Sequence, residues 1–283
     1  MSNAKKLLVI LLLIIICFLS ILGYARFIEP NLLTKKSFDV ETEKSITPCR
    51  VVFFTDTHFG RYYDDSHAEA IVDKINQSDA DLVIFGGDLL DNYARDREQI
   101  DWKALQGHLK RIDAKAGKYA VWGNHDYGGG STRIYEDFMT SCGFEVLRNE
   151  SCVLDDYGIK LAGYDDYLMG AADPSAYKDG SGMFQLNISH EPVVSQLIEN
   201  QNENFLLSGH THGGQVQIPF LTNKLLPKGS GKFTKGFYTA EEIGASVPLQ
   251  MYTSSGIGMT RYPLRFLNIP EIVEINLKPS NNS

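Results

Sequence analysis

Short runs of apolar residues recur along the chain and predict strands that are buried on both faces. The first runs are continuous rather than alternating, which is typical of a strand in a sheet that is covered on both sides, whereas the run at residues 186–188 contains one polar residue, Asn187. The runs occupy residues 51–54, 82–85, 119–122, 186–188 and 205–207. Further strands are expected at residues 145–148, 151–154 and 159–163, with a turn at residues 155–158.

A helical spacing of apolar residues appears between the first of these strands. Apolar positions recur every three to four residues in residues 65–77 and 97–112, which predicts two helices that each bury one face. Residues 131–142 are also expected to be helical. Roughly 240 residues follow the leader, which is enough for one large domain with a proper core. The pattern therefore predicts a single domain of the α/β class.

The N-terminal leader contains an uncharged apolar run, residues 7–22, preceded by Lys5 and Lys6. The run is near the shortest length for a membrane-spanning helix, and the positive charge before it favours a cytoplasmic N-terminus. A cleaved signal peptide is the alternative, but the residues after the run match a cleavage site poorly. We therefore expect a single-pass anchor in the cytoplasmic (inner) membrane, with the folded domain on the extracytoplasmic side.

These patterns divide the chain into four segments. Residues 1–26 are the transmembrane anchor or an uncleaved signal, and residues 27–48 are a tether or an edge strand. Residues 49–279 are the folded domain, and residues 280–283 are a polar tail.

The charge balance and the cysteines narrow the classes of function. The chain has 27 basic and 35 acidic residues, a formal net charge of −8, which argues against nucleic-acid binding through phosphate contacts. None of the four cysteines has the spacing of a zinc knuckle. Cys142 and Cys152 form a disulfide in an oxidising compartment or stay free buried thiols, and the sequence leaves both readings open.

Polar side chains follow each of the five apolar runs, where the strand is expected to end. In α/β sheets such side chains collect on one rim. They are the carboxylates of Asp56 and Asp88, the amide of Asn124 and the imidazoles of His58, His190, His210 and His212. Each alone also reads as a helix cap, a turn residue or a solvated side chain. Together, seven such donors suit two divalent ions, and mixed imidazole and carboxylate ligation favours Mn, Fe or Zn over Ca or Mg.

Five motifs in this order resemble the calcineurin-like metallophosphoesterases. They are Asp56-x-His58, Gly87-Asp88-x-x-Asp91, Gly123-Asn124-His125-Asp126, His190 and Gly209-His210-x-His212. The Gly213-Gly214-Gln215 run, the Asp165-Asp166 pair and residues 256–275 resemble the membrane-anchored bacterial branch of YaeI/YkuE-type phosphodiesterases. The resemblance covers roughly residues 51–277. It implies a four-layer α-β-β-α sandwich of two mixed sheets flanked by helices.

The resemblance also implies a role for each motif residue. Asp56, His58 and His212 would hold one metal ion, Asn124, His190 and His210 would hold the other, and Asp88 would bridge the two ions. His125 would stabilise the transferring phosphoryl group or protonate the leaving oxygen, and Asp91 or Asp126 would orient it. The ions would lower the pKa of a shared water, so that hydroxide attacks phosphorus in line with the leaving oxygen.

These motifs favour a phosphodiesterase or pyrophosphatase. The anchor suggests a lipid-linked substrate such as UDP-2,3-diacylglucosamine, although that lipid is made on the cytoplasmic side and the domain is expected outside. A phosphomonoesterase or phosphoprotein phosphatase with the same centre is one alternative. A non-catalytic, membrane-tethered scaffold is another, but no donor is missing. The expected protein is a monomer that contacts the membrane through its N-terminal helix.

Three arginines are candidates for contact with a phosphate group of the substrate. They are Arg61, Arg261 and Arg265. A guanidinium binds phosphate through two parallel hydrogen bonds. The alternative reading is that all three are ordinary surface residues.

Overall fold

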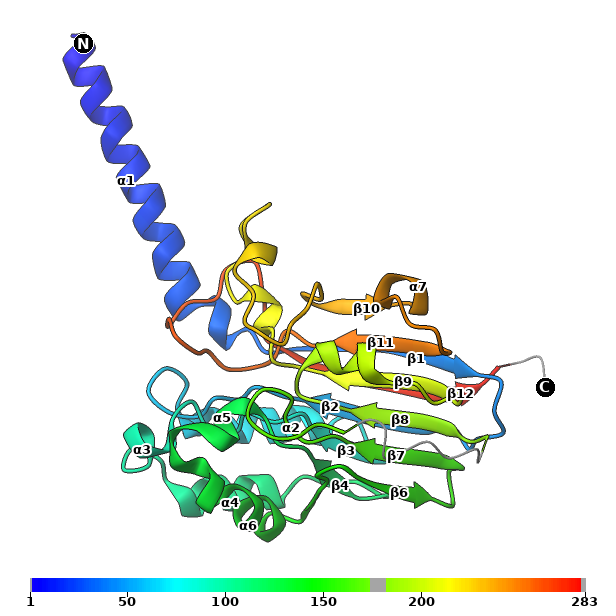
Figure 1. Ribbon diagram of the computed structural model, residues 1–283. Helices are drawn as coiled ribbons and strands as arrows, with labels where there is room; N and C mark the ends of the chain where they lie inside the picture. The colour runs from blue at the N-terminus through cyan, green and yellow to red at the C-terminus, as the bar shows by residue number, and fades with distance from the viewer. Residues whose placement is uncertain (1, 174–181, 281–283) are drawn as a thin grey trace.

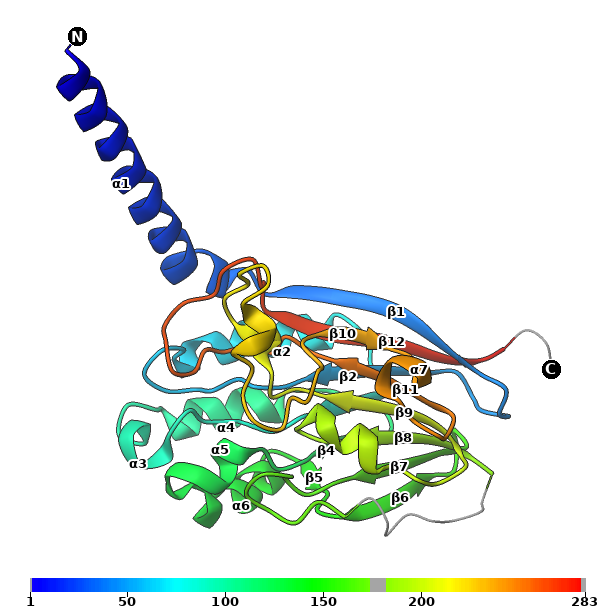
Figure 2. The same ribbon diagram turned by 45° about the horizontal axis from the view of Figure 1, so that its top comes forward.

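Two six-stranded sheets packed face to face form the body of the protein (Figure 1 and Figure 2). The computed structural model describes residues 2–173 and 182–280. The first sheet runs in the order β1 (Thr34–Thr42), β12 (Glu271–Pro279), β2 (Cys49–Phe54), β3 (Leu82–Phe85), β4 (Lys118–Ala120) and β5 (Phe144–Val146). The second runs β10 (Gly236–Tyr238), β11 (Leu249–Thr253), β9 (Glu203–Ser208), β8 (Phe184–Ile188), β7 (Ile159–Gly163) and β6 (Glu150–Leu154).

Both sheets are mixed, with parallel and antiparallel pairs of neighbouring strands. In the first sheet β2 to β5 are parallel neighbours, whereas β12 pairs with β2 in the antiparallel sense. In the second sheet β7, β8, β9 and β11 are parallel, and β6 and β10 are antiparallel at the edges. The prediction of two mixed sheets flanked by helices is therefore confirmed.

Two hydrophobic cores explain why the strand sequences are continuously apolar. Along β2, Val51 and Phe53 belong to the core between the two sheets, whereas Val52 and Phe54 belong to the core beneath the helices. All four side chains are almost completely buried. Because successive side chains of a strand point to opposite faces, a strand between two cores needs an apolar residue at every position.

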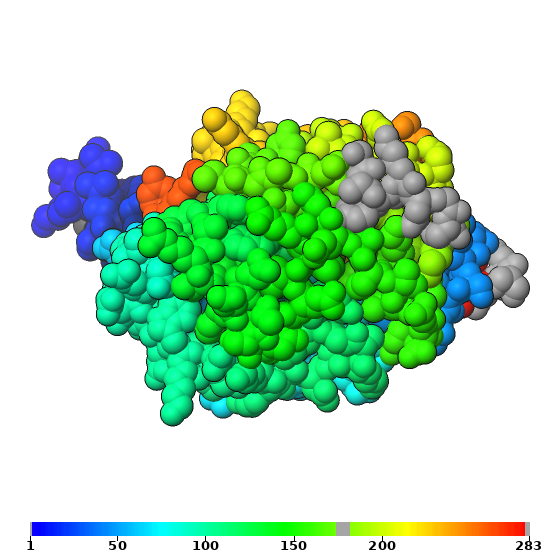
Figure 3. Space-filling model, turned by 60° about the horizontal axis from the view of Figure 1, so that its bottom comes forward, coloured from blue at the N-terminus to red at the C-terminus, as the bar shows by residue number. Residues whose placement is uncertain are grey.

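Helices cover the outer face of the first sheet more fully than that of the second. The helices on the first sheet are α2 (Ala68–Asn76), α4 (Trp102–Lys110) and α6 (Tyr135–Ser141), with the single turns α3 (Tyr93–Asp96) and α5 (Asn124–Tyr127) beside them. Figure 3 shows this side, where the teal and green segments containing α4 and α6 form the surface. Among residues 2–173 and 182–280, the second sheet carries only a 3-10 helix, Pro192–Leu197, and α7 (Ala240–Ile243).

The structure shifts some of the expected element boundaries. The second predicted helix, residues 97–112, begins only at Trp102, because the Asp101 side chain accepts the Ala104 N–H and caps it there. Residues 27–48 contain β1, which forms the edge of the first sheet. The three strands β10, β11 and β12 were not anticipated.

The N-terminal helix α1 (Asn3–Phe27) projects from the body (Figure 1). Its most apolar stretch has a mean hydropathy of 3.1 and is not buried by the rest of the chain, so it is long and apolar enough to cross a membrane. Its C-terminal end is built into the domain. There the buried Glu29 carboxylate accepts the backbone N–H groups of Leu267 and Asn268.

The cysteines do not form a disulfide in the part of the chain that the structure describes, which includes all four. Cys142 lies in the core beneath the helices, whereas Cys152 packs against the core between the sheets. The free-thiol alternative therefore holds for this pair.

Candidate metal centre

The seven predicted donors meet beyond the carboxyl ends of five strands. In each sheet the strands concerned are parallel neighbours, so their carboxyl ends lie at the same edge. The donors follow β2 (Asp56 and His58), β3 (Asp88), β4 (Asn124), β8 (His190) and β9 (His210 and His212). The two sheets thus contribute opposite sides of one site.

Asp56, His58 and His212 form one group of convergent ligand atoms. Asp56 Oδ1 lies 3.8 Å from His58 Nε2 and 3.3 Å from His212 Nε2, and the two Nε2 atoms are 2.9 Å apart. All three side chains are buried. One carboxylate oxygen and two imidazole nitrogens aimed at a common point are suitable ligands for Mn, Fe or Zn.

Asp88 connects this group to a second one. Its Oδ2 atom lies 3.3 Å from His58 Nε2 and 3.1 Å from His190 Nε2. Asp56, Asp88 and His190 are themselves convergent. Asp88 therefore faces both groups, as a carboxylate shared by two cations must.

Hydrogen bonds to backbone carbonyls orient two of the imidazoles. His190 Nδ1 donates to Gly86 O at 2.8 Å, and His210 Nε2 donates to Lys228 O at 2.6 Å. A carbonyl only accepts, so each bond fixes the tautomer and leaves the lone pair on the other ring nitrogen. Both imidazoles are therefore prepared to coordinate a cation.

Unpaired buried atoms indicate that the site fits divalent cations. Asn124 Oδ1 and His190 Nε2 are buried and have no hydrogen-bond partner within the described chain. An unpaired buried polar atom costs about 1–3 kcal/mol, so most proteins avoid it. Coordination would satisfy both atoms. The carboxylate, amide and imidazole set matches the ligands expected for a pair of such ions, and the clusters form a candidate dinuclear site.

The electrostatics of the site are dominated by burial and by charges in contact. Burial opposes ionisation of Asp56 and Asp88, but the neighbouring imidazoles outweigh it and hold both pKa values below their ordinary range. Burial similarly opposes protonation of His58, but Asp56 and Asp91 raise its pKa to about 10. His210 is different, because burial and then His190 lower its pKa to about 4. The excess negative charge near His58 is charge that a divalent cation would balance.

The backbone of the site is strained at five of the seven donors. These five have positive φ angles although none is glycine: Asp56 (54°), His58 (43°), Asp88 (60°), His210 (68°) and His212 (50°). A left-handed conformation costs a non-glycine residue roughly 1–2 kcal/mol. Such strain clusters at functional sites, where surrounding structure enforces it. Close packing enforces it here, since a Cβ at Gly123 would overlap Asp88 and one at Gly209 would overlap Asp56.

His125 lies beside the donors and is held by Asp91. His125 Nδ1 donates to the backbone carbonyl of Asp91 at 2.6 Å, and the Asp91 carboxylate is 3.8 Å away. The backbone N–H of His125 donates to Asp88 Oδ1 at 2.8 Å. The His125 side chain is 28% exposed, whereas the four donor imidazoles are buried. It is therefore the imidazole of this site that remains accessible to a substrate.

Of the two alternatives for orienting His125, the contacts favour Asp91 and not Asp126. The Asp126 carboxylate is fully buried and accepts the backbone N–H groups of Asp88, Leu89 and Gly123 at 2.7–3.0 Å. These bonds tie the loop after β3 to the start of α5. Asp126 therefore positions the backbone that carries Asp88.

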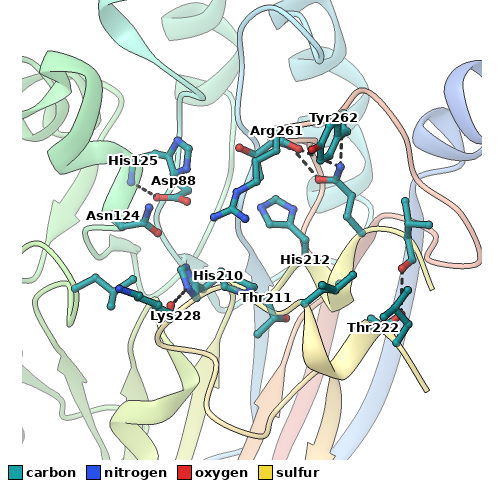
Figure 4. A pocket seen from close by; sticks show the side chains of 18 of the residues that line it. Asp88, Asn124, His125, His210, Thr211, His212, Thr222, Lys228, Arg261 and Tyr262 are labelled. Atoms are coloured by element: carbon teal, nitrogen blue, oxygen red, sulfur yellow. Dashed lines mark hydrogen bonds between the residues drawn. The ribbon is translucent and has the colours of Figure 1, made fainter. Parts of the chain in front are cut away.

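A cavity of about 570 Å³ opens onto the centre (Figure 4). Asp88, Asn124, His125, His210 and His212 line one end of it. Arg261 also lines it, and its guanidinium points toward the space between the labelled histidines (Figure 4). A cation at this place suits a phosphate oxygen.

The other two candidate arginines do not line this cavity in the described structure. Arg265 is completely buried and donates to the carbonyl oxygens of Gly258, Ser255 and Asn268. The prediction that it contacts substrate is wrong, because its donors are used to hold a loop. Arg61 is exposed, and its guanidinium lies over the Tyr62 ring at 5.5 Å from the centroid.

The structure adds site residues that the sequence motifs did not indicate. Thr260 donates its hydroxyl to Asp91 Oδ1 at 2.7 Å, and Arg95 pairs with the other oxygen of Asp91. The spacing of Arg95, four residues after Asp91, is a signal for an ion pair on one helical turn. Thr260 and the Lys228 carbonyl have no such signal, because they come from distant loops.

A sandwich of two mixed sheets whose facing rims bring carboxylates, an amide and imidazoles together is the scaffold of a metallohydrolase with a candidate dinuclear site. Residues 49–214 match the calcineurin-like phosphoesterase family, more than half of the chain, and the protein belongs to this family. It is a metal-dependent phosphoesterase.

Three relatives indicate which branch of the family this chain resembles. YkuE of Bacillus subtilis, described as an uncharacterized metallophosphoesterase, is 34% identical over 269 residues, covering 92% of this chain and 90% of that protein. Phosphodiesterase YaeI of Escherichia coli is 25% identical over 261 residues, covering 90% and 92%. A Danio rerio protein described as a transmembrane protein with a metallophosphoesterase domain is 27% identical over 292 residues, covering 95% and 62%. The predicted YaeI/YkuE-type branch is confirmed.

Proposed function

We propose that the protein is a membrane-anchored phosphodiesterase or pyrophosphatase that acts on a lipid-linked substrate. The observation that carries this proposal is a cavity that joins the candidate metal centre to an apolar wall. The wall consists of Leu168, Val216, Ile218, Leu221, Leu225 and Pro227. A phosphate group at the polar end would leave an attached acyl-bearing group against this wall.

The donors divide into two ligand sets in this proposal. Asp56, His58 and His212 hold one divalent ion, Asn124, His190 and His210 hold the second, and Asp88 contacts both. When bound, Mn, Fe or Zn ions neutralise charge on phosphate oxygens and lower the pKa of a water nucleophile. No protein nucleophile is required.

His125 acts on the leaving oxygen. Because the Asp91 carbonyl occupies Nδ1–H, Nε2 is the ring nitrogen that can hold and release a proton toward the substrate. Nε2–H first donates a hydrogen bond to the phosphoryl group and then protonates the departing oxygen. Arg261 holds a non-bridging oxygen. This contact fixes the phosphoryl group so that the leaving oxygen lies in line with phosphorus and the attacking water.

The proposed topology places α1 across the cytoplasmic membrane once. Lys5 and Lys6 precede the apolar helix and support a cytoplasmic N-terminus, which puts the catalytic domain on the extracytoplasmic side. One chain supplies all seven donors, which supports a monomer as the active unit.

Metal exchange tests the proposed reaction. The full-length protein in detergent is stripped with a chelator and reloaded with Mn²⁺, Fe²⁺ or Zn²⁺, and hydrolysis of bis- and mono-nitrophenyl phosphate is compared. Activity should vanish on stripping, return on reloading, and favour the diester in kcat/KM. Monoester preference with every metal would support a phosphomonoesterase instead. Less than one ion per chain and no activity after reloading would support the scaffold alternative.

Replacement of Arg261 by alanine should weaken the enzyme through substrate contact alone. A hydrogen bond to a charged group contributes about 1.5–3 kcal/mol, so kcat/KM for the diester should fall roughly 10–100-fold. Metal content should not change. The matched control is Arg61→Ala, an exposed arginine outside the cavity, which should behave as the parent protein. Equal losses in both variants would remove Arg261 from the proposed site.

A further inference from the structure

Two loops beside the cavity expose large apolar side chains. They are residues 217–228 and residues 260–269, here called the rim loops. Phe220 is 96% exposed. The other exposed apolar side chains of the rim loops are Ile218, Leu221, Leu225, Tyr262, Leu267 and Ile269. Clusters of this kind on a folded domain mark a surface that contacts another apolar phase.

Hydrogen bonds connect the rim loops to each other and to the end of α1. The Arg265 N–H donates to Ala25 O in the last turn of α1 at 2.9 Å. The Gln217 N–H donates to Phe266 O at 2.8 Å, which joins the two loops. In Figure 1 both loops, yellow and orange-red, project on the side from which α1 rises, and Figure 3 shows orange-red atoms against the blue helix. The rim loops are therefore fixed beside the point where α1 would leave a bilayer.

The backbone turns apolar side chains outward at two positions. Phe220 and Leu267 have φ angles of 64° and 54°, in the left-handed region that bulky residues rarely adopt. Both side chains are exposed, so the fold does not recover this strain by burying them. Strain of this kind is typical of segments kept for function.

The charge of the first rim loop differs from that of the whole chain. The chain carries −8, yet residues 204–240 contain no Asp or Glu and four lysines: Lys224, Lys228, Lys232 and Lys235. Lys224 and Lys228 belong to the rim loop and are exposed. Exposed lysines among apolar side chains are the pattern of a surface that lies on anionic lipid headgroups.

We propose that the rim loops are a second membrane contact, in which Phe220 and its apolar neighbours enter the headgroup region of an anionic bilayer beside α1. The cavity mouth then faces lipid rather than bulk water. This inference rests on α1 spanning the same bilayer and not on which ester is hydrolysed. A second copy of the chain covering the loops is the competing occupant, and the test distinguishes the two.

Tryptophan placed at the loop tip reports the contact directly. The full-length Phe220→Trp protein is placed in nanodiscs with and without anionic lipid, and with acyl chains brominated near the headgroup. The Val153→Trp protein is the control, since Val153 is exposed on β6 at the far edge of the second sheet. Fluorescence of the parent protein, which contains Trp102 and Trp122, is subtracted. The expected result is a blue shift and bromine quenching at position 220, stronger with anionic lipid, and neither at position 153.

Two outcomes of this measurement would overturn the proposal. One is an emission at position 220 that bromine does not quench in discs where α1 is inserted. The other is a blue shift that depends on protein concentration and not on bromination, which would assign the loops to self-association. Neither fluorescence readout requires enzymatic activity. A failure of the proposed hydrolysis can therefore be distinguished from a failure of the proposed membrane contact.

A second variant checks the consequence for catalysis. Phe220→Asn removes the apolar side chain and introduces a residue that tolerates positive φ, so the backbone of the loop should be preserved. Hydrolysis of soluble bis-nitrophenyl phosphate should equal that of the parent, because Phe220 does not line the cavity. Hydrolysis of a phosphodiester lipid probe embedded in the same nanodisc should fall several-fold. An unchanged rate on the embedded probe would count against the docking surface.

Discussion

Replacement of His125 by alanine is expected to lower kcat by about 10²–10⁴-fold while the metal content stays at the parental value. In the proposed reaction His125 supplies the proton that the leaving oxygen needs, and its Nδ1 is engaged with the Asp91 carbonyl. Its side chain is 28% exposed, and neither of the two proposed ligand sets includes it. Steady-state rates on bis-nitrophenyl phosphate and elemental analysis of the same sample measure the two effects.

The adjacent residue is the matched control. Asn124→Ala removes a buried amide oxygen that has no protein partner, so it should weaken metal binding and lower activity through that loss. Extra metal in the assay should partly restore the activity of Asn124→Ala and should not restore the activity of His125→Ala. Equal loss of metal in both variants would contradict the separate roles assigned to these neighbours.

Asp88→Ala is expected to have the largest effect of any single substitution. Asp88 Oδ2 faces His58 and His190 at 3.3 and 3.1 Å, so its removal takes a carboxylate from both ligand sets. Bound metal should fall from about two ions per chain to one or fewer. Bound metal stabilises the charge of the transition state by several kcal/mol, so kcat/KM should fall by at least about 10³-fold.

A buried carboxylate outside the ligand sets provides the control for Asp88. Asp165 accepts hydrogen bonds from the Tyr127 hydroxyl and from Arg148, and it belongs to no convergent group of ligand atoms among the described residues. Asp165→Asn should retain the parental metal content. Thermal unfolding with and without metal shows whether each variant folds. Retention of two ions by a folded Asp88→Ala protein would exclude a shared carboxylate at this position.

The sequence was sufficient to predict which side chains lie together at this rim, because their position follows from strand topology. Asp56, Asp88 and Asn124 each follow a continuous apolar run, and such runs are visible without a structure. Parallel neighbours then bring their ends together automatically. The helices near residues 65–77 and 131–142 were equally visible, because their periodicity is local.

Residues whose role depends on distant partners were not predictable in this way. Arg265 and Asp126 have the charges expected of substrate and catalytic groups, but each is buried and bonded to backbone groups of other loops. The left-handed φ angles of five donors and the carbonyl of Lys228 that orients His210 also follow from tertiary packing. The strands β10 to β12 are defined by pairing with other strands, some of them distant in the sequence, and not by a local periodicity of apolar residues.

The joint between α1 and the domain has a consequence for proteolytic shedding. Ala25 O accepts the Arg265 N–H, and Glu29 accepts the N–H groups of Leu267 and Asn268. A protease that cut after Glu29 would separate α1 from a fragment that keeps every metal-centre donor yet loses the acceptors of the loop behind Arg261. We therefore expect such a fragment to be an impaired phosphoesterase, because the loop that carries Arg261 would lose these hydrogen bonds.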